Sequence, residues 1–236
     1  MAQWCLSWQY YRSLRDTLNH SVGVTVFSSN QVDLLASALD LPLDKFTVVP
    51  FGVDTEYYTP GSERDDYVAV AGNDVGRDWP TFLRAATELP DIHFRVASGR
   101  EHFRRLAVPE NVALLGSLST DDYRSLLRRC LFVVLPCHPM AYPSGQSVLL
   151  ESHACGKIVV GPLTAALREY ARDGIYLPFD PGDTRSLVGA TRRALASTTD
   201  DSALAAAARG HVVENFTNEH MWEAVAPVLT KAVARF

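Results

Sequence analysis

The stretch LFVVLPCHPMAYPSGQSVLLESHACGKIVVGP, residues 131–162, predicts a strand, a loop, a helix and a second strand. Residues 131–135 form a short apolar run with β-branched residues at its centre, which is typical of a strand buried on both faces. The three prolines of residues 136–144 cannot continue a strand or a helix, so this segment must be a loop. Apolar residues then recur at helical spacing over residues 145–155, and KIVVG at 157–161 is another apolar run. We therefore expect a right-handed βαβ unit.

The start of this predicted helix has the features of an anion-binding site. Ser144, Gly145, Gln146 and Ser147 would present unpaired backbone N–H groups there, and the helix dipole favours negative charge at this end. Gly145 has no side chain, so a ligand phosphate could approach the backbone closely. The carboxylate of Glu151, about one and a half turns further along, is within reach of a ribose attached to that phosphate. An alternative interpretation is that a serine simply caps the helix and that Glu151 is a solvated acid.

Length, charge and cysteine content limit the class of protein. A chain of 236 residues is long enough for one or two domains with a sizeable core. Its composition is typical of globular proteins, and the net charge of −5 argues against a nucleic-acid partner. No apolar run approaches the length of a membrane span, and the N-terminus lacks the pattern of a signal peptide. The four cysteines show no zinc-type spacing, so we expect no metal site and a cytoplasmic location, with peripheral membrane attachment left open.

Strands and helices alternate along the rest of the chain. Further strands are expected over residues 22–27, 46–49, 67–71, 92–97, 112–115 and 175–179. Pro178 places the last of these at a sheet edge, because proline cannot donate to the ladder. Helices are expected over residues 3–18, 164–170, 186–196 and 203–215, up to Leu39, after Asp78, after Ser119 and from residue 218. This alternation predicts an α/β fold with a Rossmann-like parallel sheet covered by helices on both faces.

Three of the predicted loops follow strands and should therefore meet at one edge of the sheet. They are residues 72–77, 116–118 and 137–147, and ligands bind at this edge in sheets of this kind. Arg77 lies on the first loop, where its guanidinium could bind a diphosphate through two hydrogen bonds. A surface ion pair with a neighbouring aspartate is an equally good interpretation.

Four fragments, in this order, resemble family 4 of the glycosyltransferases: VVPFGVDTEYYTP, AVAGNDVGRDWPTFLRAA, NVALLGSLSTDDYRSLLRRCLFVVLP and PSGQSVLLESHACGKIVVG. Members of that family are retaining sugar transferases of the GT-B architecture, in which two Rossmann-like domains face a cleft. The resemblance implies a remnant of the acceptor-side domain at residues 1–50, a crossing linker at 51–62 and a nucleotide-sugar donor-binding domain at 63–217. It also implies that residues 218–236 form a helix that packs back on the N-terminal part.

The resemblance assigns roles to individual residues. It implies that Glu151 holds the ribose and that Arg77 binds the diphosphate in the place usually held by a lysine, so these two are the candidate catalytic residues. The other donor contacts that we expect are Gly72, Ser144, Gly145, Gln146 and Ser147. The first acid of the family's Glu-x7-Glu motif falls on Pro143, so the residue that orients the donor sugar is absent or its role has passed to Gln146.

We therefore expect the donor-binding portion of a glycosyltransferase that transfers a sugar with retention, without a metal or other cofactor. Its expected partners are a nucleotide sugar and either a partner chain or an N-terminal domain that supplies the acceptor contacts. The alternatives are a non-catalytic nucleotide-binding or interaction module, and one subunit of a split glycosyltransferase. Nucleotide binding without turnover would distinguish the module. A dinucleotide oxidoreductase is disfavoured, because AGNDVG is not a G-x-G-x-x-G motif.

Overall fold

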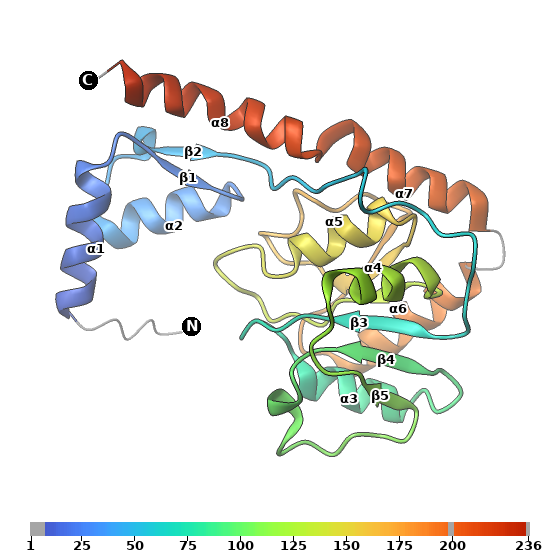
Figure 1. The fold of residues 1–236 in the computed structure, drawn as a ribbon. Helices are drawn as coiled ribbons and strands as arrows, with labels where there is room; N and C mark the ends of the chain where they lie inside the picture. The colour runs from blue at the N-terminus through green and yellow to red at the C-terminus, as the bar shows by residue number, and fades with distance from the viewer. Residues whose placement is uncertain (1–7, 198–200, 235–236) are drawn as a thin grey trace.

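The computed structural model describes residues 8–197 and 201–234. Within these ranges, an extended segment joins a small α/β unit to a larger one (Figure 1). The chain begins in the small unit with α1 (Trp8–His20). This helix corresponds to the one expected over residues 3–18, of which residues 3–7 lie outside the described part.

The small unit is built around a two-stranded parallel sheet. β1 (Val24–Val26) pairs with β2 (Phe46–Val48), and the chain between them forms α2 (Asn30–Leu39) and the short 3-10 helix η1 (Leu43–Lys45). Apolar residues of the strands and of α2 share one core: Val26, Ala36, Leu39, Leu41 and Phe46. Polar contacts fix this unit against the larger one, since both the backbone N–H and the hydroxyl of Ser29 donate to Glu169.

The large unit contains a six-stranded sheet in which every pairing is parallel, and this confirms the predicted α/β fold. The strands are β3 (Val68–Ala71), β4 (Phe94–Ala97), β5 (Val112–Leu114), β6 (Val133–Val134), β7 (Val159–Pro162) and β8 (Tyr176–Phe179). Their order across the sheet is β5-β4-β3-β6-β7-β8. Pro178 lies in the edge strand β8, as predicted, and there its lack of an N–H costs no ladder hydrogen bond.

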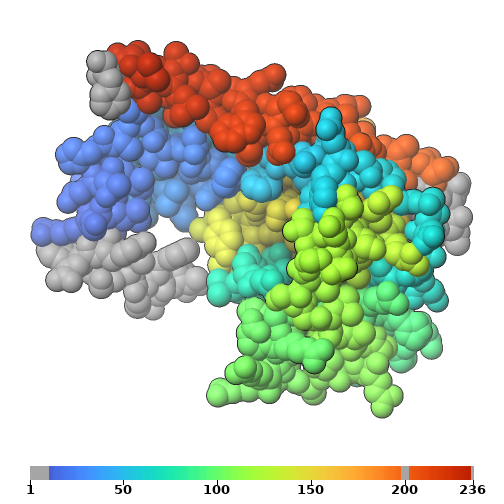
Figure 2. Space-filling model, in the orientation of Figure 1, coloured from blue at the N-terminus to red at the C-terminus, as the bar shows by residue number. Residues whose placement is uncertain are grey.

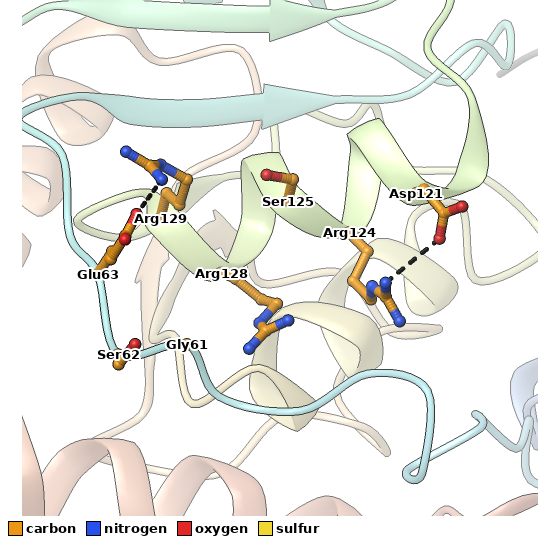
Figure 3. Close-up of a pocket in the computed structure, with 8 residues that line it drawn as sticks. All are labelled: Gly61, Ser62, Glu63, Asp121, Arg124, Ser125, Arg128 and Arg129. Atoms are coloured by element: carbon orange, nitrogen blue, oxygen red, sulfur yellow. Dashed lines mark hydrogen bonds and ion pairs between the residues drawn. The ribbon is translucent and has the colours of Figure 1, made fainter.

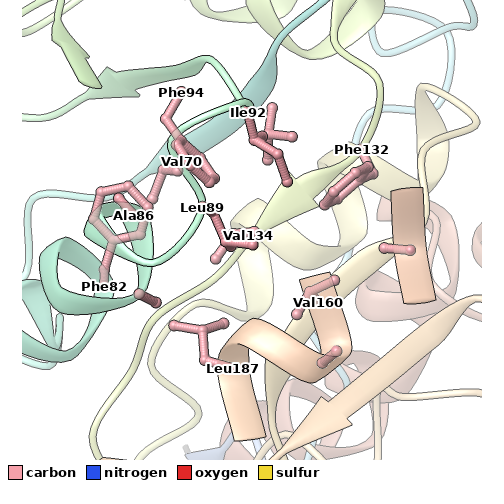
Figure 4. Close-up of a cluster of buried hydrophobic side chains, with 14 of the residues drawn as sticks. Val70, Phe82, Ala86, Leu89, Ile92, Phe94, Phe132, Val134, Val160 and Leu187 are labelled. Atoms are coloured by element: carbon pink, nitrogen blue, oxygen red, sulfur yellow. The ribbon is translucent and has the colours of Figure 1, made fainter. Parts of the chain in front are cut away.

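One face of this sheet is covered by α3 (Trp79–Thr87) and α6 (Thr184–Ser197). Their apolar side chains pack on alternate residues of the central strands, among them Val70, Val134 and Val160, and all three are fully buried (Figure 4). α3 begins where the sequence predicts, because the carboxylate of Asp78 accepts a 3.1 Å hydrogen bond from the backbone N–H at position 81. The short 3-10 helix η2 (Arg100–Phe103) follows β4 beside this core.

The opposite face is covered by α4 (Thr120–Arg129) and α5 (Gln146–Ala154). These helices pack on the intervening strand residues, such as Ala71 and Val159. α7 (Asp201–Asn215) packs along α5 and closes this layer. The sheet is therefore doubly wound, because residues that alternate along each strand face different helix layers.

The chain returns from the large unit to the small one through α8 (Asn218–Val233), which runs along both units (Figure 2). Thr217 caps this helix, and the carbonyl oxygen at position 216 accepts a 2.9 Å hydrogen bond from the Val53 N–H of the joining segment. Gly52 is required at this crossing, because a Cβ there would lie 2.5 Å from the Thr217 carbonyl oxygen. The crossing is thus fixed by backbone contacts between two distant segments.

The prediction of a helix over residues 164–170 is wrong. These residues form consecutive turns after β7, with a 3.1 Å backbone hydrogen bond from Arg168 N–H to the Thr164 carbonyl. Leu167 and Tyr170 have helical spacing because both are buried, and Tyr170 bonds to the small unit through the Phe27 carbonyl. Tertiary packing, and not helix formation, accounts for the apolar spacing of this segment.

Candidate functional site

The strand order reverses between β3 and β6, which are neighbours at the centre of the sheet. The chain leaves β3 toward one edge of the sheet and leaves β6 toward the other, so the loops that follow these strands separate and leave a crevice. The crevice holds a cavity of ≈ 230 Å³. Its lining comes from the ends of two strands, from two loops and from two helices: Ala71, Gly72, Asn73, Ala97, Ser117, Leu118, Tyr123, Ser147, Val148 and Glu151.

The N-terminus of α5 forms one wall of this cavity. Gly145 precedes the helix with φ 94°, a left-handed conformation, and a Cβ there would lie 2.8 Å from Leu135 Cδ1. The Gln146 N–H is already bonded to the Pro143 carbonyl at 3.1 Å. Within the described residues, the backbone N–H groups of the next two positions, 147 and 148, have no hydrogen-bond partner, and both positions line the cavity. Of the four amides that the sequence suggested, those at positions 144 and 146 are therefore bonded within the loop, and the amide at position 148 is free although it was not expected.

Glu151 lies about one turn deeper along α5, beside two tyrosines. The hydroxyl of Tyr123, from α4, donates a 2.9 Å hydrogen bond to Glu151 Oε2. The hydroxyl of Tyr58, from the joining segment, also donates a hydrogen bond to this carboxyl group. Burial raises the pKa of Glu151 to about 7, although both tyrosine hydroxyls oppose this shift by favouring the ionised form. The cavity thus contains a carboxyl group that titrates near neutral pH.

Arg77 lies behind the cavity wall, and it is absent from the cavity lining. Its guanidinium is buried above Gly72, where Nε donates a 3.0 Å hydrogen bond to the Ala71 carbonyl. Its Nη1 donates to Asp74 Oδ1 at 2.8 Å and to Ser144 Oγ at 2.9 Å. Among the described residues only Nη2 lacks a partner, and this nitrogen is next to Gly72, which lines the cavity. Arg77 therefore joins two loops and leaves one donor toward the site.

The structure gives a reason for the glycine at position 72 that the sequence did not reveal. Gly72 has φ 138°, and a Cβ at this position would lie 1.9 Å from Arg77 Nε. The absence of a side chain makes room for the guanidinium of the same chain, and the sequence-based reason, close approach of a ligand, is not needed to explain it. Both reasons are compatible, because Gly72 also faces the cavity.

The predicted site residues thus separate into two groups. Gly72, Ser147 and Glu151 line the cavity together. The others stand next to it: Arg77 and Ser144 in the hydrogen-bonded network, Gly145 and Gln146 at the start of α5. Sequence reasoning missed the contributions of Asn73, Leu118, Tyr58, Tyr123 and Val148. Asn73 and Leu118 lie on loops that were expected at this edge, whereas nothing local in the sequence distinguishes the two tyrosines from ordinary core residues.

A second hollow, of ≈ 270 Å³, lies between α4 and residues 61–63, away from this edge of the sheet (Figure 3). Three arginines line it, but acidic side chains pair with two of them. Arg129 is bonded to Glu63 and to another carboxylate, and Arg124 lies 3.3 Å from Asp121. This pairing leaves little net positive charge for an anion.

The described residues contain no group of three or more His, Cys, Asp or Glu side chains arranged to hold a metal ion. Among the same residues, no helix is long and apolar enough to cross a membrane.

Comparison with solved structures identifies the fold. Sucrose-phosphate synthase from Thermosynechococcus elongatus superposes with a TM-score of 0.82 at 16% identity, over 97% of this chain and 62% of that one. HepE from Anabaena, solved in complex with UDP and glucose, gives a TM-score of 0.80 at 17% identity, over 95% of this chain and 67% of that one. The large unit therefore has the Rossmann-like architecture found in GT-B glycosyltransferases, as expected from the sequence.

Sequence comparison gives the family. The D-inositol 3-phosphate glycosyltransferase of Mycolicibacterium gilvum is 31% identical over 156 residues, which are 56% of this chain and 34% of that protein. The corresponding protein of Mycobacterium sp. strain KMS is 30% identical over 171 residues, or 61% of this chain and 38% of that protein. The chain thus spans little more than a third of the length of these relatives. The glycosyl transferase-like family matches residues 77–226, and the chain belongs to that family.

Proposed function

We propose that this chain is the donor-binding portion of a retaining glycosyltransferase, and that the cavity at the α5 N-terminus holds the nucleoside diphosphate of a nucleotide sugar. One observation carries the proposal: unpaired helix N–H groups and a partly buried carboxyl group lie on the same helix and line the same cavity. The first feature suits a phosphate and the second suits the hydroxyls of a ribose.

The diphosphate would be bound mainly by backbone groups. The N–H groups of Ser147 and Val148 point from the first turn of α5, where the helix dipole favours negative charge. Gly72 faces them across the cavity, and the Nη2 donor of Arg77 is adjacent to it. These fixed donors would stabilise the negative charge that develops on the departing diphosphate. The site would therefore need no metal ion for this step.

The transfer itself would need no side-chain nucleophile. The bond between the anomeric carbon and the diphosphate oxygen breaks, and its electron pair stays on that oxygen. The acceptor hydroxyl attacks the anomeric carbon from the same face, and its proton passes to the departing diphosphate. In the GT-B architecture that the sequence resembles, the acceptor would be held by residues outside the large unit.

The alternative is a module that binds a nucleotide but does not transfer a sugar. Pro143 supports it, because the family's first motif acid falls there and proline cannot orient a sugar by hydrogen bonding or charge. The two functions differ in turnover. Release of free nucleoside diphosphate from a nucleotide sugar indicates transfer or hydrolysis, and binding without release indicates the module.

Titration calorimetry with UDP, GDP and ADP in turn tests the proposed site. We expect at least one of them to bind the wild-type protein. Glu151→Gln should weaken that binding at least tenfold, because an amide has one neutral acceptor oxygen, whereas a carboxylate can accept charged hydrogen bonds from two ribose hydroxyls. Glu223→Ala, on the exposed surface of α8, is the matched control and should bind like wild type. Equal affinity of wild type and Glu151→Gln would contradict the proposal.

A further inference from the structure

Three tyrosines form a row that leads from the joining segment to Glu151. Tyr57 and Tyr58 pack edge to face with ring centroids 5.1 Å apart, and Tyr58 packs in the same way on Tyr123 of α4 at 6.5 Å. Tyr123 then donates its 2.9 Å hydrogen bond to the Glu151 carboxyl group, and Tyr58 donates a second hydrogen bond to the same group. The row therefore ends on the acid of the proposed donor site.

Other contacts hold this row rigidly against the site. Arg209 of α7 donates 2.9 Å hydrogen bonds to the carbonyl oxygens of Thr55 and Tyr58, and a 2.8 Å bond to the last carbonyl of α5, at Ala154. One guanidinium thus fixes the backbone of Tyr58 to the helix that carries Glu151. A tyrosine on an extended segment would otherwise be free to move away from the carboxyl group.

We infer that Tyr58 and Tyr123 are positioning residues of the proposed donor site, and that they hold the Glu151 carboxylate oriented and ionised to accept the ribose hydroxyls of a nucleotide. The inference rests on the proposed function, because it assumes that Glu151 binds the ribose. Tyr123 occupies Oε2 of the carboxylate, so further lone pairs remain for a ligand that enters the cavity.

The electrostatics agree with this arrangement. The groups that interact with Glu151 among the described residues are Tyr123 of α4, Tyr58 of the joining segment and Cys155 at the end of α5. Burial raises the pKa of both tyrosines and of Cys155, so all three stay neutral near pH 7 and the tyrosines remain donors. Since both donors favour the carboxylate, removing either hydroxyl should make Glu151 harder to ionise.

The test compares the pH dependence of nucleotide binding in four variants: Glu151→Gln, Tyr123→Phe, Tyr58→Phe and Tyr57→Phe. Wild-type affinity for the best-bound of UDP, GDP and ADP should rise with pH and then level off. The midpoint of this rise should be the pH at which the Glu151 carboxyl group titrates. Tyr123→Phe and Tyr58→Phe should each move the midpoint up by about one pH unit, the value expected for the loss of one charged hydrogen bond. Tyr57→Phe is the matched control, because its hydroxyl bonds to Asp121 at 2.6 Å, and it should leave the midpoint unchanged.

Glu151→Gln distinguishes the titration of the nucleotide phosphate from the titration of the Glu151 carboxyl group. It should retain the titration of the nucleotide phosphate and lose the step that belongs to the carboxyl group. Carboxyl ¹³C NMR of the unliganded protein gives an independent midpoint for Glu151. Unchanged midpoints by both methods in Tyr123→Phe and Tyr58→Phe would overturn the inference. Shifted NMR midpoints without binding of any nucleotide to wild type would instead overturn the proposed function and leave the link between the tyrosines and the carboxyl group intact.

Discussion

The guanidinium of Arg77 donates a 2.9 Å hydrogen bond to the hydroxyl of Ser144, and so joins two loops that are 67 residues apart in the sequence. The same hydroxyl donates to Asp74 Oδ2 at 2.6 Å, which closes a partly buried ring of three side chains. One of these loops follows β3 and the other leads into α5, so the ring fixes the two sides of the candidate site relative to each other.

Arg77→Lys is expected to destabilise the protein by about 2–4 kcal/mol, because a lysine cannot replace the bonds to Ala71, Asp74 and Ser144 together and leaves Asp74 Oδ1 without its guanidinium donor. The measurement is the free energy of unfolding from urea titration. Arg105→Lys, on an exposed turn, is the control and should change this free energy by less than about 0.5 kcal/mol. A change at Arg77 as small as the one at Arg105 would show that the ring is not structural.

Gly72→Ala should cost about 2 kcal/mol more than Gly182→Ala, another glycine with positive φ. A Cβ meets nothing within 4 Å at Gly182, whereas at Gly72 it would lie 1.9 Å from Arg77 Nε. Both substitutions carry backbone strain, so the difference in unfolding free energy isolates the clash. In an Arg77→Ala background this difference should disappear, and its persistence there would rule out the guanidinium as the cause.

The raised pKa of Glu151 should make the folded state lose stability as pH rises. The folded pKa of about 7 exceeds the ordinary value of 4.5, so the native state binds more protons between these two values. The loss therefore develops from about pH 4.5 to about pH 7 and has an upper bound of about 3 kcal/mol. Glu151→Gln should remove it, so the variant should gain stability relative to wild type over this range in urea titrations. A pH-independent difference between the two proteins would contradict the prediction.

His153 should give the opposite slope. It is fully buried on α5, its Nε2 has no partner among the described residues, and burial lowers its pKa from 6.5 to about 4. The unfolded chain then binds more protons between these values, so stability is fully present above about pH 6.5 and is lost as pH falls through 4. His153→Phe should lower stability at pH 7, where it removes the bond to the Lys157 carbonyl, and should flatten this acid slope.

His93→Phe is the control for that experiment, since His93 is an exposed residue before β4. It should leave the slope between about pH 6.5 and pH 4 as it is in wild type. An acid slope that survives in His153→Phe would have to come from other groups, such as the buried His211, whose pKa burial also lowers.

The sequence predicted the fold well, because the signals that define a doubly wound sheet are local. The apolar run before residue 136, the prolines after it and the cap at Asp78 act within a few residues of chain. It failed at residues 164–170, where burial of Leu167 and Tyr170 gives helical spacing without a helix. Local periodicity does not reveal which residues are apolar for tertiary contacts alone.

What the sequence by itself determined is the parallel sheet, the start of α5 and the presence of Gly72, Ser147 and Glu151 at one edge, since strand direction sends all loops of one kind to the same side. What only the tertiary structure decided is the surroundings of those residues. The burial of Arg77 over Gly72, and the placing of Tyr58 and Tyr123 on Glu151, depend on contacts between segments far apart in the chain. Hydrogen bonding and desolvation depend on distance in space, and no local pattern in a sequence encodes that distance.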